Sequence, residues 1–254
     1  MKFWRLRMLG LAAALVAATV VFMPALVAAD AIDPTARWLA PWSFTPNSLS
    51  IDHGFGADAS AFRSFGDLGD AENLPDTAAS AFSRASASSG TFGDASASTG
   101  LSFSRSFQLS GSPDGWDVKL SGRLVGLLLA ASSSSPSASV TASAMITGGP
   151  AINFGTITVA PDRQLMLDRD MVGSAVKSDG TYTVQGSLTT SASIQASGLF
   201  SSSGSAIADF AAPGNGFFVG VDATPRAVPE PSILILLGTG LVGIGGAARR
   251  KLWT

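Results

Sequence analysis

His53 is the only histidine in this chain of 254 residues, and it limits the catalytic chemistry that the chain can perform. A Ser-His-Asp triad would have to use His53. Asp52 precedes it, but adjacency in sequence gives no evidence of the geometry that a triad needs. One histidine is also too few for a histidine-rich zinc site. We therefore interpret His53 as a surface or loop residue, and expect neither catalytic residues nor a resident cofactor.

A cluster of acidic residues follows Gly66 and could bind a hard cation. Carboxylates on a glycine-containing loop suit Ca²⁺, which makes Asp67, Asp70 and Glu72 weak candidates for a calcium site. Their spacing matches neither the EF-hand loop nor the glycine-aspartate nonapeptide repeat. The alternative, which we favour, is a solvated acidic loop without a metal.

Trp38 and Trp42 are candidates for contact with a glycan. Together with Phe44 they could form a flat aromatic surface on which sugar rings stack. They could equally belong to the hydrophobic core, which is the commoner role for aromatic residues of a terminal strand. A set of threonines could form ladders of the kind that an ice-facing sheet needs, but their irregular spacing does not favour ice binding: Thr156, Thr158, Thr181, Thr183, Thr189 and Thr190.

The elements that position these residues are predicted to be strands, because apolar and polar residues alternate along most of the chain. Leu101–Leu109 alternates cleanly except for Arg105, which falls on the apolar side without an evident reason. The residues Gly111–Gly115 have strong turn chemistry. Trp116–Leu124 is a second alternating run, which continues into the fully apolar Val125–Ala131. We predict that the two runs form a β-hairpin.

Further alternating or apolar runs predict strands at 138–146, 152–159, 181–196, 206–210 and 217–221. Within the third of these, Gly186 is expected to mark a bulge or bend. The pattern of Arg163–Val172 is ambiguous and allows a short helix. Ala57–Thr99 is rich in Ser and Ala, and allows either strands with small side chains or a partly ordered, low-complexity segment. Seven to nine strands joined by Gly/Ser/Pro loops predict an all-β fold, a β-sandwich of jelly-roll type.

Residues 1–29 are predicted to be a signal peptide. Basic residues at positions 2, 5 and 7 precede the apolar Leu9–Val27, and small residues up to Ala29 suit signal peptidase. We expect cleavage after Ala29. The length of the apolar segment leaves an uncleaved membrane anchor as the alternative.

Residues 228–254 combine a proline motif, an apolar span and a basic cluster. Residues 232–248 carry no charge and reach the length of about 17 residues that a transmembrane helix requires. Three cations follow the span and would hold the C-terminus on the cytoplasmic side: Arg249, Arg250 and Lys251. Pro229 and Pro231 keep the helix from extending outward, and leave Pro229, Glu230 and Pro231 as an exposed, extended tripeptide.

This tail resembles the PEP-CTERM sorting signal of Gram-negative surface proteins, which is also catalogued as an "ice-binding protein C-terminal" domain. The resemblance covers about a tenth of the chain. It implies recognition of Pro229, Glu230 and Pro231 by an exosortase, a membrane-embedded cysteine protease that cuts near the motif. It also implies an intermediate anchored in the inner membrane, followed by a cell-surface or secreted product.

The body, residues 30–227, is long enough for one sizeable domain. Ten of the 16 basic residues and 17 of the 18 acidic residues lie between the two ends, so the body is acidic. This charge argues against nucleic acid as a partner. Cysteine is absent, which removes disulfides, thiolate metal sites and a cysteine nucleophile.

Together these features predict a secreted, exosortase-processed cell-surface or extracellular-matrix protein. Its partners would be signal peptidase and exosortase during export, the membrane before processing, and afterwards exopolysaccharide or envelope glycans. Polar Ser/Thr faces would make many weak contacts without catalysis. A carbohydrate-binding module built on Trp38 and Trp42 is the second hypothesis. An enzyme acting on polysaccharide is the third hypothesis. It ranks last because the sequence does not locate the two carboxylates that a glycosidase needs.

Overall fold

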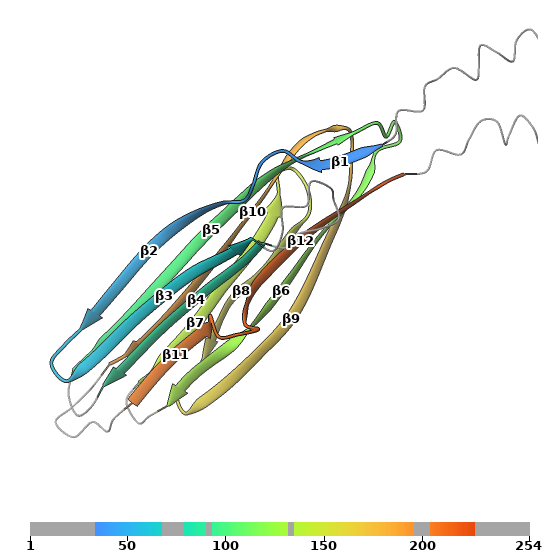
Figure 1. Ribbon diagram of the computed structural model, residues 1–254. Coiled ribbons are helices and arrows are strands. Elements are labelled where there is room, and N and C mark those ends of the chain that lie inside the picture. The colour runs from blue at the N-terminus through green and yellow to red at the C-terminus, as the bar shows by residue number, and fades with distance from the viewer. Residues whose placement is uncertain (1–33, 68–78, 90–92, 132–134, 196–203, 227–254) are drawn as a thin grey trace, which may run out of the picture. The chain divides into compact units, whose positions relative to one another are not determined.

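The computed structural model describes residues 34–67, 79–89, 93–131, 135–195 and 204–226. The predicted signal peptide, the sorting motif Pro229–Pro231, the apolar span 232–248, the basic residues 249–251 and the calcium candidates Asp70 and Glu72 lie outside this range. The described residues form twelve strands and no helix (Figure 1). In this part of the chain, therefore, no helix is long and apolar enough to cross a membrane.

Six strands form one antiparallel sheet, here called sheet A, in the order β1-β5-β10-β7-β8, with β2 also paired to β5. Its strands are β1 (Thr35–Trp38), β2 (Ser43–His53), β5 (Ala95–Ser110), β7 (Ser137–Ile146), β8 (Ala151–Val159) and β10 (Gly180–Ile194). The short β1 and the longer β2 pair with successive parts of the same edge of β5. Sheet A is therefore five strands wide along most of its length.

The other six strands form sheet B, in the order β11-β4-β12-β6-β9, with β3 paired to β4. Its strands are β3 (Ala57–Asp67), β4 (Ala79–Ser89), β6 (Trp116–Ala131), β9 (Arg163–Lys177), β11 (Gly204–Phe210) and β12 (Gly216–Pro225). Both β11 and β12 pair with β4 and β6. They fill one position of the sheet in succession, separated by a loop at 211–215.

The two sheets pack face to face, which confirms the predicted β-sandwich; its jelly-roll character stays a prediction. Alternate residues of most strands are buried between the sheets, and the largest buried side chains include Trp116, Phe107, Phe210 and Phe217. A second, smaller cluster is built almost entirely from alanines: Ala57, Ala85, Ala87, Ala95, Ala97, Ala192, Ala206 and the single larger residue Ile194. The core thus has an aromatic and aliphatic part and a part lined by small side chains.

The predicted hairpin of Leu101–Leu109 with Trp116–Ala131 is wrong. The first run belongs to β5 of sheet A and the second to β6 of sheet B, so Gly111–Gly115 carries the chain from one sheet to the other. Both runs bury their apolar side in the same core. Alternation reports which side of a strand is buried, but it does not distinguish a partner in the same sheet from one in the opposite sheet.

Three other local expectations are settled by the strand pairing. The helix allowed at Arg163–Val172 is wrong, because β9 pairs with β6 along its whole length. Of the bulge or bend expected at Gly186, the bulge is wrong, because β10 pairs with β5 without a register shift. A Cβ atom at Gly186 would lie 2.2 Å from the ring of Phe103, so the glycine makes room for that ring. Within Ala57–Thr99, the described residues form strands with small side chains, the first of the two alternatives.

Candidate binding face

The outer face of sheet A is covered by hydroxyl side chains. Period-two alternation turns the apolar residues of β5, β7 and β10 inward and leaves Ser and Thr outside. Along the lengths of β5, β7, β8 and β10, the only charged residue is Arg105, and it points into the core. The face is therefore uncharged over four adjacent strands.

The strand registers align these hydroxyls in rows that run across the sheet. Ser106 of β5 bonds to Thr183 of β10 at 2.9 Å, and Thr141 of β7 bonds to Thr156 of β8 at 2.9 Å. Ser139 and Ser191 form a third such pair, at 2.7 Å. Cross-strand pairs of this kind stabilise a sheet modestly and also fix the orientation of the hydroxyls.

A groove of about 570 Å³ crosses this face, and we call it the sheet A groove. Two neighbouring rows of side chains line it. One row consists of Thr45, Ser102, Ser187, Ser143 and Asn153, from β2, β5, β10, β7 and β8 in turn. The other row follows the same strands through Ser43, Ser104, Gln185, Met145 and Ala151. No charged residue lines the groove.

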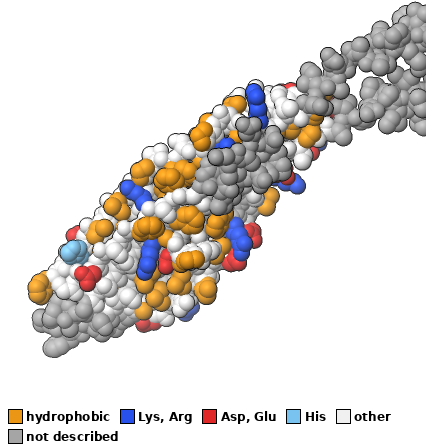
Figure 2. Space-filling model, viewed as in Figure 1, with side chains coloured by type: hydrophobic (Ala, Val, Ile, Leu, Met, Phe, Trp, Pro, Cys, Tyr) orange, Lys and Arg blue, Asp and Glu red, His pale blue; other side chains and the backbone are white. Residues whose placement is uncertain are grey.

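The outer face of sheet B has a different composition. Figure 2 shows hydrophobic side chains mixed with Lys, Arg and Asp over this sheet. Phe62, Met166 and Val172 are exposed there, and Arg123 pairs with Asp168. Among the described residues, the outer face of sheet B therefore lacks the continuous polar, uncharged surface that covers β5, β10, β7 and β8 of sheet A.

Trp38 and Trp42 lie in the hydrophobic core, each 7% exposed. Their rings are 5.4 Å apart and contact Phe107 and Phe103 edge-on. Rings buried in this way present no flat face to a sugar. The structure therefore favours the core interpretation of the two tryptophans over the exposed stacking surface.

Arg105 completes this aromatic cluster and explains the exception in the apolar pattern of its strand. Its guanidinium carbon lies 4.4 Å from the centre of the Trp38 ring, and its Nε donates to the carbonyl oxygen of Ala40 at 2.5 Å. A cation over an aromatic face is attractive, and the hydrogen bond partly satisfies the buried charge. Arg105 thus has a structural role in holding the segment between β1 and β2.

Asp52 and His53 do not act together, since consecutive residues of a strand point to opposite sides of the sheet. Both lie at the exposed end of β2, opposite Ser96 and Ala95. His53 is therefore a surface residue of an edge strand. Among the residues that the structure describes, no group of three or more His, Cys, Asp or Glu could hold a metal ion. Asp67 is the last residue of β3, and the two other calcium candidates, Asp70 and Glu72, lie outside the described residues.

Asp179 joins two loops at one end of the sandwich. Its carboxylate accepts hydrogen bonds from Trp116 Nε1 at 2.9 Å and from the backbone N–H groups of Gly111 and Ser112. These bonds, that of Trp116 foremost, lower the pKa of the Asp179 carboxyl below its ordinary value. Asp179 therefore ties the turn before β10 to the chain that crosses between the sheets.

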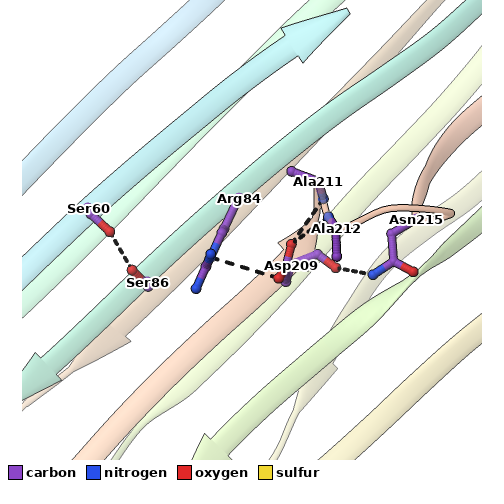
Figure 3. A network of polar contacts seen from close by, with 7 residues as sticks. All are labelled: Ser60, Arg84, Ser86, Asp209, Ala211, Ala212 and Asn215. Carbon is purple, nitrogen blue, oxygen red and sulfur yellow. Dashed lines mark hydrogen bonds and ion pairs between the residues drawn. The ribbon is translucent and has the colours of Figure 1, made fainter.

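Asp209 has a comparable role in the middle of sheet B, shown in Figure 3. Its Oδ1 accepts the N–H groups of Ala211 and Ala212, and its backbone oxygen accepts the side-chain amide of Asn215. Its other carboxylate oxygen lies 3.9 Å from Arg84 Nε. These contacts close the loop between β11 and β12.

The body is thus an all-β, two-sheet sandwich with an uncharged hydroxyl face. Residues 227–251 match the PEP-CTERM protein-sorting motif, so the chain carries the sorting signal that its proline motif, apolar span and basic cluster indicated. The motif implies export and a membrane-anchored sorting intermediate. A search of curated proteins found no match.

Two solved structures show a distant likeness. One is the enzymatically active domain of bacteriophage CBA120 tailspike protein 4, at 11% identity and a TM-score of 0.18, covering 73% of this chain and 20% of that one. The other comes from a study of carbohydrate-binding modules of the β-sandwich superfamily, at 9% identity and a TM-score of 0.17, covering 73% and 58%. Similarity this low carries no functional argument.

Sequence reasoning missed the sheet A groove. The alternation did place Ser102, Ser104 and Ser187 on the polar side of their strands. The alternation pattern does not contain the order of the strands, which brings β2, β5, β10, β7 and β8 side by side. The polar sides of five strands that are separate in sequence thereby become one surface.

Proposed function

We propose that this protein is exported, processed by an exosortase, and acts at the cell surface or in the extracellular matrix as a non-catalytic binder of exopolysaccharide or envelope glycans. The observation that carries the proposal is the hydroxyl face of sheet A. Ser and Thr hydroxyls can each donate one hydrogen bond and accept two, which matches the hydroxyls of a polysaccharide. Many weak contacts over such a face add up when the ligand is a polymer.

The lining of the sheet A groove supports binding without turnover at that site. Hydrolysis of a glycosidic bond requires two carboxyl groups on either side of it, and no carboxylate lines the sheet A groove. Asp179, Asp209 and Asp168 are engaged in structural contacts elsewhere. The alternative of a module built on Trp38 and Trp42 would need both buried rings to become exposed, at the cost of the core contacts that they make.

The processing part of the proposal is tested by the intact mass and terminal sequence of the protein recovered from its host. We expect a product that begins after Ala29 and ends close to Pro229–Pro231. In a host strain without its exosortase, the same protein should keep residues 232–254 and stay with the inner membrane. Released protein with the complete tail in the normal host would contradict the proposal.

A further inference from the structure

We propose that the sheet A groove binds a single chain of a neutral polysaccharide, which lies across the strands. This inference rests on the proposed function, for which it names the site and the class of ligand. The groove is the place where the hydroxyl face is hollowed, and it extends over all five strand positions of the sheet.

The lining selects a neutral ligand. Its side chains are hydroxyls, amides and apolar groups, without a cation or an anion. A charged ligand would lose hydration on entering and would meet no opposite charge in return. The acidic residues that predominate in the body add a long-range repulsion for polyanions. A neutral, hydroxyl-rich polymer loses the least hydration free energy on entering the groove. It can exchange its hydrogen bonds with water for hydrogen bonds with the groove.

Ser102, in the groove, exchanges hydrogen bonds with Asn47 at 2.8 and 3.1 Å, but the serine pair at the centre of the groove is less engaged than a pair beside it. Ser143 and Ser187, in the groove, are 3.4 Å apart, longer than an ordinary hydroxyl hydrogen bond. Ser139 and Ser191, four residues further along the same two strands, are 2.7 Å apart. The groove pair can therefore bond to a ligand at little cost, whereas the outer pair would first have to give up a good hydrogen bond.

The two rows of the groove set the direction of the ligand. Neighbouring strands are about 4.8 Å apart, so a row across five strands spans about 19 Å between its outer strands. A linear polymer lying along a row meets a new side chain at each strand, from Thr45 at one edge to Asn153 at the other. Met145, which is 48% exposed, offers an adaptable apolar contact for the C–H groups of a sugar ring.

A matched pair of substitutions tests this site in the protein recovered from its host. Ser187→Phe places a ring in the middle of the groove, and Ser191→Phe places the same ring on the same strand and face outside it. The probes are the neutral and the acidic fractions of the host's own extracellular polysaccharide, in affinity electrophoresis. We expect the normal protein and Ser191→Phe to bind the neutral fraction, and Ser187→Phe to bind it at least about tenfold more weakly.

Gln185→Ala provides a milder second variant, since it removes one exposed amide from the groove without filling it. Loss of about one hydrogen bond predicts binding that is weaker by roughly 2- to 10-fold. Equal binding by Ser187→Phe and Ser191→Phe would overturn the groove while leaving polysaccharide binding intact. Preference for the acidic fraction would overturn the class of ligand. Absence of binding to either fraction would overturn the proposed function, and the groove with it.

Discussion

At the scale of single residues, polar and charged groups of this protein hold its loops in place. Asp179 receives three hydrogen bonds from the chain that crosses between the sheets. Arg105 is buried against Trp38 and bonds to Ala40. In both cases one side chain ties down a connection that has no strand partner of its own. The stability of these connections should therefore depend on the charge and shape of single residues.

The Asp179 contacts predict an acid-sensitive contribution to stability. A carboxyl whose pKa is lowered in the folded state stabilises the fold above the unfolded pKa of about 3.9. That contribution is lost as the pH falls through the folded-state value. Asp179→Asn should lower the melting temperature at pH 7, and its difference from the normal protein should shrink toward pH 2. Asp114→Asn, an exposed neighbour in the crossing loop, is the control. An equal effect of both variants at every pH would contradict this role.

Arg105 gives a second prediction at this scale. Arg105→Met keeps the apolar stem but loses the hydrogen bond to Ala40 and the cation over Trp38. We expect a loss of about 1–3 kcal/mol in the free energy of unfolding, measured by urea denaturation. Tryptophan fluorescence should change as well, because Trp38 is a direct contact. Arg163→Met on the exposed end of β9 should stay within about 0.5 kcal/mol of the normal protein; a similarly small effect of Arg105→Met would argue against the contact.

At the scale of elements, glycines opposite aromatic rings allow neighbouring strands to pack. Gly186 of β10 lies beneath the ring of Phe103 of β5. Gly126 of β6 has the same relation to Phe210 of β11, whose ring atoms would lie 2.3 Å from an added Cβ. In each pair the phenylalanine ring fills the space above the glycine, where a second side chain would overlap with the ring.

Gly126→Ala should accordingly be destabilising by about 1–3 kcal/mol, as for other overpacked sites. Adding Phe210→Leu to it should recover part of the loss, because the smaller side chain leaves room for the methyl group. Gly220→Ala, whose Cβ would meet only the flexible hydroxyl of Ser121, is the matched control for glycine entropy. The normal protein, Gly126→Ala, Phe210→Leu and the variant with both changes form a double-mutant cycle, and additive effects on the free energy of unfolding would contradict direct overlap.

The sequence predicted most strands of the second half, because apolar and polar residues alternate over most of 138–146 and 181–196. It did not predict their partners. Trp116–Ala131 was predicted to form a hairpin with Leu101–Leu109, but the two runs belong to different sheets and face each other across the core. The sequence pattern of Arg163–Val172 was ambiguous, and these residues form a strand because β9 pairs with β6. The groove depends on five such pairings at once, which is why only its polar residues, and not the groove, could be predicted.

At the scale of the whole molecule, the core is unevenly built. One part buries tryptophan, phenylalanine and leucine, whereas the other is lined almost entirely by alanine. Burial of an alanine methyl removes little apolar area from water compared with burial of Leu or Phe. The alanine-lined part, which includes residues of β3, β4 and β11, should therefore hold its strands together less strongly.

Amide hydrogen exchange should reveal this difference. We expect the amides of Ala85, Ala87 and Ala206 to exchange through local opening, well before those of Leu120 and Leu124 in β6. Ala87→Val adds two methyl groups to the alanine-lined part of the core. The resulting change in exchange rate should be confined to the amides of that part. Uniform protection across both parts of the core would show that the sandwich opens only as one unit.

We propose that the processed protein binds the matrix polysaccharide of its host without altering it. The most direct measurement is to incubate the protein recovered from the host with that polysaccharide and to determine both the bound fraction and the length of the polysaccharide chains. We predict saturable binding with an unchanged distribution of chain lengths. Shortened chains would identify an enzyme, and an absence of binding would contradict a role for the hydroxyl face of sheet A.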